Sequence, residues 1–78
     1  MSWRIVFDVG VAPKTIIAIY RNYKLSYHVY WVAGNLLRFW YAVLFKGKKA
    51  IEFSSVEELE KYLIEHNLPS CKSLPYLS

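Results

Sequence analysis

Aromatic rings and positive charges are interleaved in the middle of this chain. Between positions 20 and 45, Arg21, Lys24, His28 and Arg38 stand among Tyr, Trp and Phe residues. The whole chain has 7 Tyr, 4 Phe and 3 Trp in 78 residues, which is more than a core of this size needs. Aromatic rings stack on nucleobases, and Lys and Arg pair with phosphates. The pattern therefore predicts non-catalytic binding of single-stranded nucleic acid, either DNA or RNA.

The distribution of charge points to the same class of partner. Ten Lys and Arg residues oppose six Asp and Glu residues, and five of the six acids lie at positions 52–65. Residues 1–51 therefore carry nearly all of the excess positive charge, which favours a polyanion as their partner. A protein for double-stranded nucleic acid would need fewer rings and more Lys and Arg, so the composition favours a single strand.

The length predicts a single domain at 1–69 followed by a C-terminal tail at 70–78. A chain this short buries a modest fraction of its surface, yet 55% of its residues are hydrophobic. The excess apolar surface predicts a homodimer or a ligand groove. An alternative function is therefore a homo-oligomeric assembly module whose aromatic face is a protein interface.

Hydrophobic periodicity predicts the elements of the first third. Positions 3–9 alternate between apolar and polar residues, which is typical of a strand, and the segment 10–13 ends it. Positions 13–24 are ambiguous. The apolar residues at 16, 19, 20 and 23 have helical spacing, whereas the β-branched residues at 15, 16, 17 and 19 favour a strand. We prefer the helix for this segment.

The remaining elements have clearer signals. Strands are expected at 25–32 and 36–45 around a turn at 33–35, and a third at 49–53 after the basic turn 46–48. A helix is expected at 55–66, because Ser54 and Ser55 can form a capping box with Glu57 and Glu58, and Asn67 and a following Pro end it. The fold class is α+β, with an antiparallel sheet of three or four strands and one or two helices.

Strand alternation also predicts which residues share a face. Leu25, Tyr27 and Val29 fall on one apolar face with the odd-numbered residues from 37 to 45, and this face is expected to pack on the helix. The opposite face mixes rings with cations. Its candidate nucleic-acid-binding residues are His28, Tyr30, Arg38, Trp40, Lys46, Lys48 and Lys49.

Within that set, Tyr30 and Trp40 are the expected stacking rings, and Arg38 and the three lysines are expected on phosphates. The competing interpretation is that both rings are covered, either by the segment 13–24 or by a second subunit.

Sequence patterns for other functions are missing. The chain has neither a P-loop nor a GxGxxG motif, and His28 and His66 have no partner at the spacing of a triad or a metal site, so no cofactor and no metal are expected. The lone Cys71 favours a reducing, cytoplasmic setting, and positions 1–10 lack the apolar core of a signal peptide. A membrane span at 29–45 is disfavoured, because it would place Arg38 near the bilayer centre.

The chain resembles the ThermoDBP-related single-stranded-DNA-binding proteins of hyperthermophilic archaea. The resemblance covers residues 3–66 and consists of the expected architecture, the rings Tyr30 and Trp40, and the run KKAIEFSSVEELEKYL at 48–63. It implies an antiparallel sheet with packed helices that carries an aromatic, basic groove for single-stranded DNA or RNA. The single Met and single Cys agree with a thermophilic source.

A second resemblance follows from the element order. A helix at 13–24, three strands and a helix at 55–66 would be similar to the double-stranded-RNA-binding-like fold, which also includes HicA-type toxin ribonucleases. That resemblance implies His28 as the histidine on the first strand. The chain departs from the pattern in its additional N-terminal strand and in the many rings around His28. Ribonuclease activity is therefore the third hypothesis.

Overall fold

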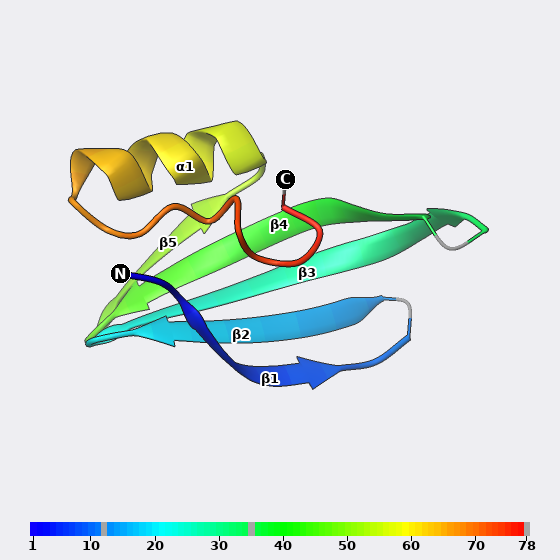
Figure 1. Ribbon diagram of the computed structural model, residues 1–78, viewed down its shortest axis with the longest axis horizontal. Helices are drawn as coiled ribbons and strands as arrows, with labels where there is room; N and C mark the ends of the chain where they lie inside the picture. Colours follow the sequence, from blue (N-terminus) through cyan, green and yellow to red (C-terminus); the bar gives the residue numbers. More distant parts are fainter. Residues whose placement is uncertain (12, 35, 78) are drawn as a thin grey trace.

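The computed structural model describes residues 1–11, 13–34 and 36–77, which form five strands and one helix. The strands run as a single antiparallel meander in the order β1-β2-β3-β4-β5, and the helix follows the last strand (Figure 1). The elements are β1 (Arg4–Val9), β2 (Lys14–Tyr20), β3 (Tyr23–Ala33), β4 (Leu36–Lys46), β5 (Lys49–Phe53) and α1 (Val56–Glu65). The fold is therefore α+β, but the sheet has five strands and not the three or four expected.

The additional strand is β2, so the preference for a helix at 13–24 is wrong. Ile17 of β2 pairs with Phe7 of β1 on one side and with Ser26 of β3 on the other. Ile16 and Ala18 are fully buried on one face of this strand. Because β-branched side chains pack well on a pleated surface with neighbours on both sides, the pairing overrides the helical spacing.

The loss of that helix also removes the basis of the resemblance to HicA-type ribonucleases. The element order in the described residues is five strands followed by one helix, and not helix, three strands and helix. His28 therefore lies in the third strand of a meander.

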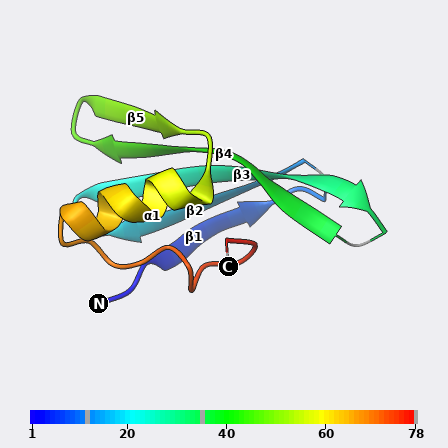
Figure 2. The same ribbon diagram turned by 90° about the horizontal axis from the view of Figure 1, so that it is seen from above.

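The hydrophobic core lies between one face of the sheet and a second layer formed by α1 and the C-terminal tail (Figures 1 and 2). The tail crosses the sheet after the helix, and Tyr27 in β3 donates a hydrogen bond to its Pro75 carbonyl at 3.1 Å. The buried residues that form this core are Trp3, Ile16, Ala18, Leu25, Tyr27, Val29, Ala42, Leu44, Phe53, Leu59, Leu63, Leu68, Cys71, Leu74 and Leu77.

A β-bulge at Trp40 changes the faces of β4. His28 pairs with Tyr41 but the next residue, Val29, pairs with Phe39, so Trp40 is an extra residue in β4. The expected core face is correct for Leu25, Tyr27 and Val29, and Phe39 packs against the core as predicted. Beyond the bulge the alternation reverses.

As a result Ala42 and Leu44 are buried, and the expected core positions Tyr41, Val43 and Phe45 lie on the opposite face. Ala50 follows Phe45 to that face because the two residues pair. Lys46 pairs with Lys49 across the β4–β5 turn. The strand β3 extends one residue beyond the expected end at 32, since Ala33 pairs with Leu36.

The distal half of the β3–β4 hairpin projects from the body of the molecule (Figure 1). β5 pairs with β4 only from Ala42 to Lys46, so the earlier part of β4 has a free edge. Trp31 and Leu36, near the end of this hairpin, are 58% and 49% exposed. The expected turn at 33–35 includes Asn35, which lies outside the described residues.

The helix matches the expected boundaries, since α1 has Ser55 as its N-cap and His66 as its C-cap. The Ser55 hydroxyl accepts a hydrogen bond from the Glu58 amide at 3.1 Å, and Glu57 and Glu58 lie in the first turn. Leu59 and Leu63 are buried on its inner face. In the described part of the chain, no helix has the length and apolarity to cross a membrane.

We expect Ser55→Ala to lower the free energy of unfolding by about 0.5–2 kcal/mol, because the Glu58 amide loses its hydrogen-bond acceptor. Urea denaturation followed by circular dichroism measures this change. Ser54→Ala is the matched control, since the Ser54 hydroxyl does not cap the Glu58 amide. An equal loss in both variants would contradict the assignment of Ser55 as the cap.

The only cysteine is buried in the second layer. The Cys71 amide donates to the Glu60 carboxylate at 2.9 Å, and the Cys71 Sγ lies 3.4 Å from the same oxygen. Burial, together with this carboxylate, raises the pKa of the Cys71 thiol to about 12.

We expect iodoacetamide at pH 8 to alkylate the native protein roughly a thousandfold more slowly than the unfolded chain, because a thiol pKa of about 12 leaves little thiolate compared with an ordinary pKa of about 8.5. Mass spectrometry with and without urea measures both rates. Rapid labelling of the native protein would show that the tail detaches readily from the core.

Candidate nucleic-acid interface

The face of the sheet opposite α1 has no second layer in the described part of the chain, and we call it the outer face. It can be assigned from the register, because residues paired across strands share a face and alternate along each strand. The outer-face residues are Arg4, Phe7, Val9, Thr15, Ile17, Ile19, Lys24, Ser26, His28, Tyr30, Arg38, Tyr41, Val43, Phe45, Ala50 and Glu52.

The two predicted stacking rings lie on this side of the molecule. Tyr30 and Trp40 line a shallow hollow of about 380 Å³ and are 43% and 54% exposed. The bulge turns Trp40 outward, where its indole and the Tyr41 ring form a T-shaped pair with a centroid distance of 5.2 Å and an interplanar angle of 87°. Neither ring is covered by the segment 13–24, since that segment is a strand of the sheet.

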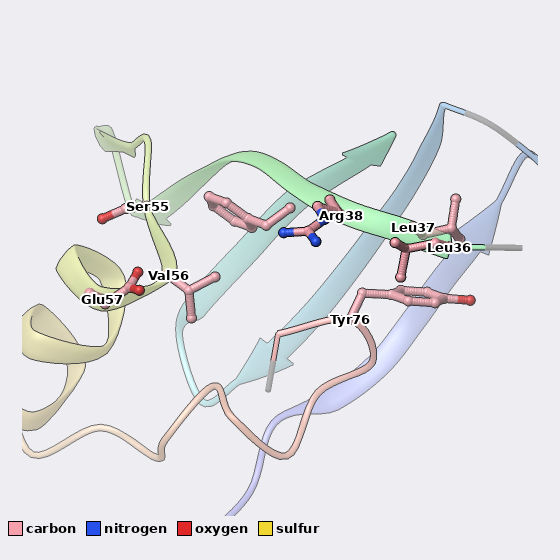
Figure 3. Close-up of a pocket in the computed structure, with 8 residues that line it drawn as sticks. Leu36, Leu37, Arg38, Ser55, Val56, Glu57 and Tyr76 are labelled. Carbon is pink, nitrogen blue, oxygen red and sulfur yellow. The ribbon is translucent and has the colours of Figure 1, made fainter. Parts of the chain in front are cut away.

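The predicted cation of this region, Arg38, pairs directly with Tyr30 across the hairpin. Arg38 also lies on the free edge of β4, and its guanidinium points into a second hollow, between the hairpin and the start of α1 (Figure 3). This edge hollow has a volume of about 390 Å³, and its other lining residues are Leu36, Leu37, Phe39, Ser55, Val56, Glu57 and Tyr76.

His28 is held in place by two neighbours on the outer face. Its Nδ1 lies 3.0 Å from the Thr15 hydroxyl, and its ring stacks on Tyr41 at a centroid distance of 4.5 Å. Burial lowers the pKa of the His28 imidazole. No carboxylate among the described residues forms an ion pair with it. At neutral pH His28 therefore presents a ring and a hydrogen-bonding group but not a charge.

The three lysines of the predicted site lie elsewhere. Lys46 shares the face of Leu44, which is buried in the core, so its side chain is on the α1 side of the sheet. Its ammonium group lies 5.2 Å from the centre of the Tyr23 ring. Lys49 pairs with Lys46 and lies on the same side, and Lys48 lies in the turn between them. The structure thus separates the predicted basic group from Tyr30 and Trp40.

Charge on the outer face is nevertheless mostly positive. Arg4, Lys24 and Arg38 are its cations, and Glu52 is its only acid among the described residues. The Lys24 ammonium lies over the Phe45 ring at 4.8 Å. Three cations against one anion give this face a net positive charge.

Sequence reasoning missed Tyr41, Phe45 and Lys24 as members of this face. Positions 39–45 are all apolar or aromatic. Without alternating apolar and polar residues in this stretch, the sequence gives no sign of the bulge at Trp40. The rings of the chain do not form one cluster. Pairs such as Trp3 with Tyr20, and Phe53 with Tyr62, belong to the α1 side.

Comparison with known proteins gives no match. No family model, no curated protein and no solved structure is similar to this chain. Within the part of the chain that the structure describes, no group of His, Cys, Asp and Glu has the arrangement of a metal site.

Proposed function

We propose that this protein binds single-stranded nucleic acid, DNA or RNA, on its outer face without catalysing a reaction. The observation that carries the proposal is the pair of exposed rings, Tyr30 and Trp40, which line one open hollow with Arg38 directly opposite Tyr30. Base stacking on an aromatic side chain contributes about 1–3 kcal/mol for each base. Two rings can thus hold two bases, and the Arg38 guanidinium, which points into the edge hollow (Figure 3), can bind a phosphate beyond them.

The hollow suits an unpaired base better than a duplex. Its lining consists of two aromatic side chains, and no Lys or Arg is among the described residues that line it. A duplex keeps its bases stacked on one another and offers mainly phosphates to a protein surface. A single strand exposes the faces of its bases, which the indole of Trp40 and the phenol of Tyr30 are able to cover.

The test is a fluorescence titration with oligo-dT and oligo-U. Trp40 and Trp31 are exposed whereas Trp3 is buried, so stacking on Trp40 should quench part of the emission. Trp31→Phe should keep this quenching, and Trp40→Phe should remove most of it. No change of emission in the parent protein, together with no binding by an independent method such as calorimetry, would overturn the proposal.

Salt dependence provides a second measurement on the same complex. If n phosphates are contacted, the logarithm of the association constant should fall with the logarithm of salt concentration with a slope of about −0.7n. We expect Arg38→Gln to weaken binding to every oligonucleotide and to reduce the steepness of this slope by about 0.7. An affinity that does not depend on salt would contradict a role for the outer-face cations.

A second copy of the chain is the competing occupant of the outer face. Apolar residues such as Ile17, Ile19 and Val43 are only half-buried there, and two such sheets can pack face to face. Light scattering would then give about twice the 9.2 kDa of one chain. If that dimer persists at high oligonucleotide concentration and shows no quenching, assembly through this face is the function and nucleic-acid binding is wrong.

A further inference from the structure

A smaller and more enclosed pocket lies on the other side of the sheet, between the last turn of α1 and the β4–β5 hairpin. Its volume is about 180 Å³. Its lining includes two aliphatic side chains, Leu44 and Ile51, and two aromatic rings, Tyr23 and Tyr62. This pocket shares no lining residue with the hollow at Tyr30 and Trp40, so what it binds can be tested separately from the proposed function.

Three nitrogen-bearing side chains converge on this pocket. Lys46 and Lys49 are paired in register and line it together with His66. The Lys46 ammonium is held 5.2 Å from the centre of the Tyr23 ring, which keeps it at the pocket. No carboxylate among the described residues lies within salt-bridge distance of either lysine, and no acid lines the pocket.

His66 is oriented by two contacts with the helix. Its ring stacks on Tyr62 at a centroid distance of 3.9 Å, and its Nδ1 lies 2.9 Å from the Tyr62 carbonyl oxygen. The carbonyl can only accept a hydrogen bond, so Nδ1 is the donor and Nε2 remains for a ligand. In the protonated form of the ring, Nε2 is a donor as well.

We propose that this pocket binds a phosphoryl group, carried either by the end of a nucleic-acid strand or by a small phosphate. The two ammonium groups supply several donors to one anion, a protonated His66 adds Nε2 as another, and no acid is among the described residues that line the pocket. The volume is well below the roughly 300–1,000 Å³ of pockets that enclose a drug-sized ligand. A single phosphoryl group with few attached atoms therefore fits, and a whole nucleotide does not.

The first experiment titrates inorganic phosphate into the full chain and follows the His66 and Tyr62 ring signals by NMR. We expect saturable shifts of both rings. Replacing both lysines, Lys46→Gln with Lys49→Gln, should lower the affinity about tenfold or more, because charged hydrogen bonds are lost. Lys48→Gln is the matched control, since it removes a charge from the same hairpin outside the pocket. It should leave the affinity nearly unchanged.

Two results would overturn the inference. One is the absence of saturable shifts in the parent protein. The other is a loss of affinity in the Lys48→Gln control that is as large, for each charge removed, as the loss in the double variant, which would show that only the overall charge matters. If the lysines instead compensate the negative end of α1, the double variant loses stability and the parent protein shows no phosphate binding.

The source of the phosphoryl group is decided with oligo-dT carrying a 5′-phosphate, a 3′-phosphate or neither. A terminal phosphate that raises the affinity, with the gain lost in the double variant, assigns the strand end as the ligand. Binding of inorganic phosphate with no preference among the three oligonucleotides assigns a small phosphate. Trp40→Ala should leave the inorganic-phosphate titration unchanged, so failure of the outer-face proposal and failure of this pocket give different results.

Discussion

We expect Trp3→Ala to lower the free energy of unfolding by about 3–5 kcal/mol. Trp3 is 6% exposed, and its indole packs 6.0 Å from the Tyr20 ring. Its Nε1 donates to the Pro69 carbonyl at 2.8 Å, which ties the N-terminus of the sheet to the residues that follow α1. The substitution removes a buried ring and leaves that carbonyl without its donor.

For a chain of this length the total stability is about 4–12 kcal/mol, so this loss is a large fraction of it. Urea denaturation followed by circular dichroism measures the change. Trp3→Phe is the matched control, because it retains most of the ring but not the hydrogen bond, and it should cost less. A midpoint unchanged by Trp3→Ala would contradict the packing of the tail on the sheet.

Replacing Trp40 by Ala should instead lower the affinity for nucleic acid and leave the stability nearly unchanged. Trp40 is 54% exposed at the bulge and forms a T-shaped pair with the Tyr41 ring. We expect Trp40→Ala to change the free energy of unfolding by no more than about 0.5 kcal/mol, as is usual for surface positions. The affinity for oligo-dT should fall by about 1–3 kcal/mol, which is roughly 5- to 150-fold.

Measuring both the stability and the oligo-dT affinity of the Trp40 variants distinguishes nucleic-acid binding by the outer face from assembly through it. Trp40→Phe keeps an aromatic surface and should retain part of the affinity, whereas Trp31→Ala, at an exposed indole outside the hollow, should retain nearly all of it. A stability loss at Trp40 as large as that at Trp3, with no change in affinity, would mean that Trp40 is buried in an interface between two copies.

Local signals in the sequence were sufficient for several elements. The helix was predictable because Ser55 caps it, Glu57 and Glu58 favour its positive end, and Leu59 and Leu63 repeat at helical spacing. The strand at 49–53 and the basic turn before it were also predictable, since alternation and turn chemistry act over a few neighbouring residues. These features depend on short-range interactions, which the order of residues encodes directly.

Only pairing with neighbouring strands makes the segment of β2 a strand and not a helix. The residues at 16, 19, 20 and 23 satisfy a helical stripe, while Ile16 and Ala18 also satisfy the inner face of a strand. The segment is so short that its apolar residues fit both the helical period and the two-residue period of a strand, so the local pattern cannot distinguish the two structures. Pairing with β1 on one side and β3 on the other supplies hydrogen bonds and side-chain contacts that an isolated helix at these positions would lack.

The candidate site was also predictable from the sequence in part. Residue type and order were enough to propose the exposed rings Tyr30 and Trp40, and Arg38 beside them, because stacking and phosphate pairing are properties of the side chains themselves. Which of the predicted nucleic-acid-binding residues lie on each face of the sheet could be known only from the fold. A single extra residue at Trp40 reverses the alternation in β4, so Lys46 faces α1 while Tyr30 faces outward. A bulge is set by the match between two strands, and neither strand alone carries that information.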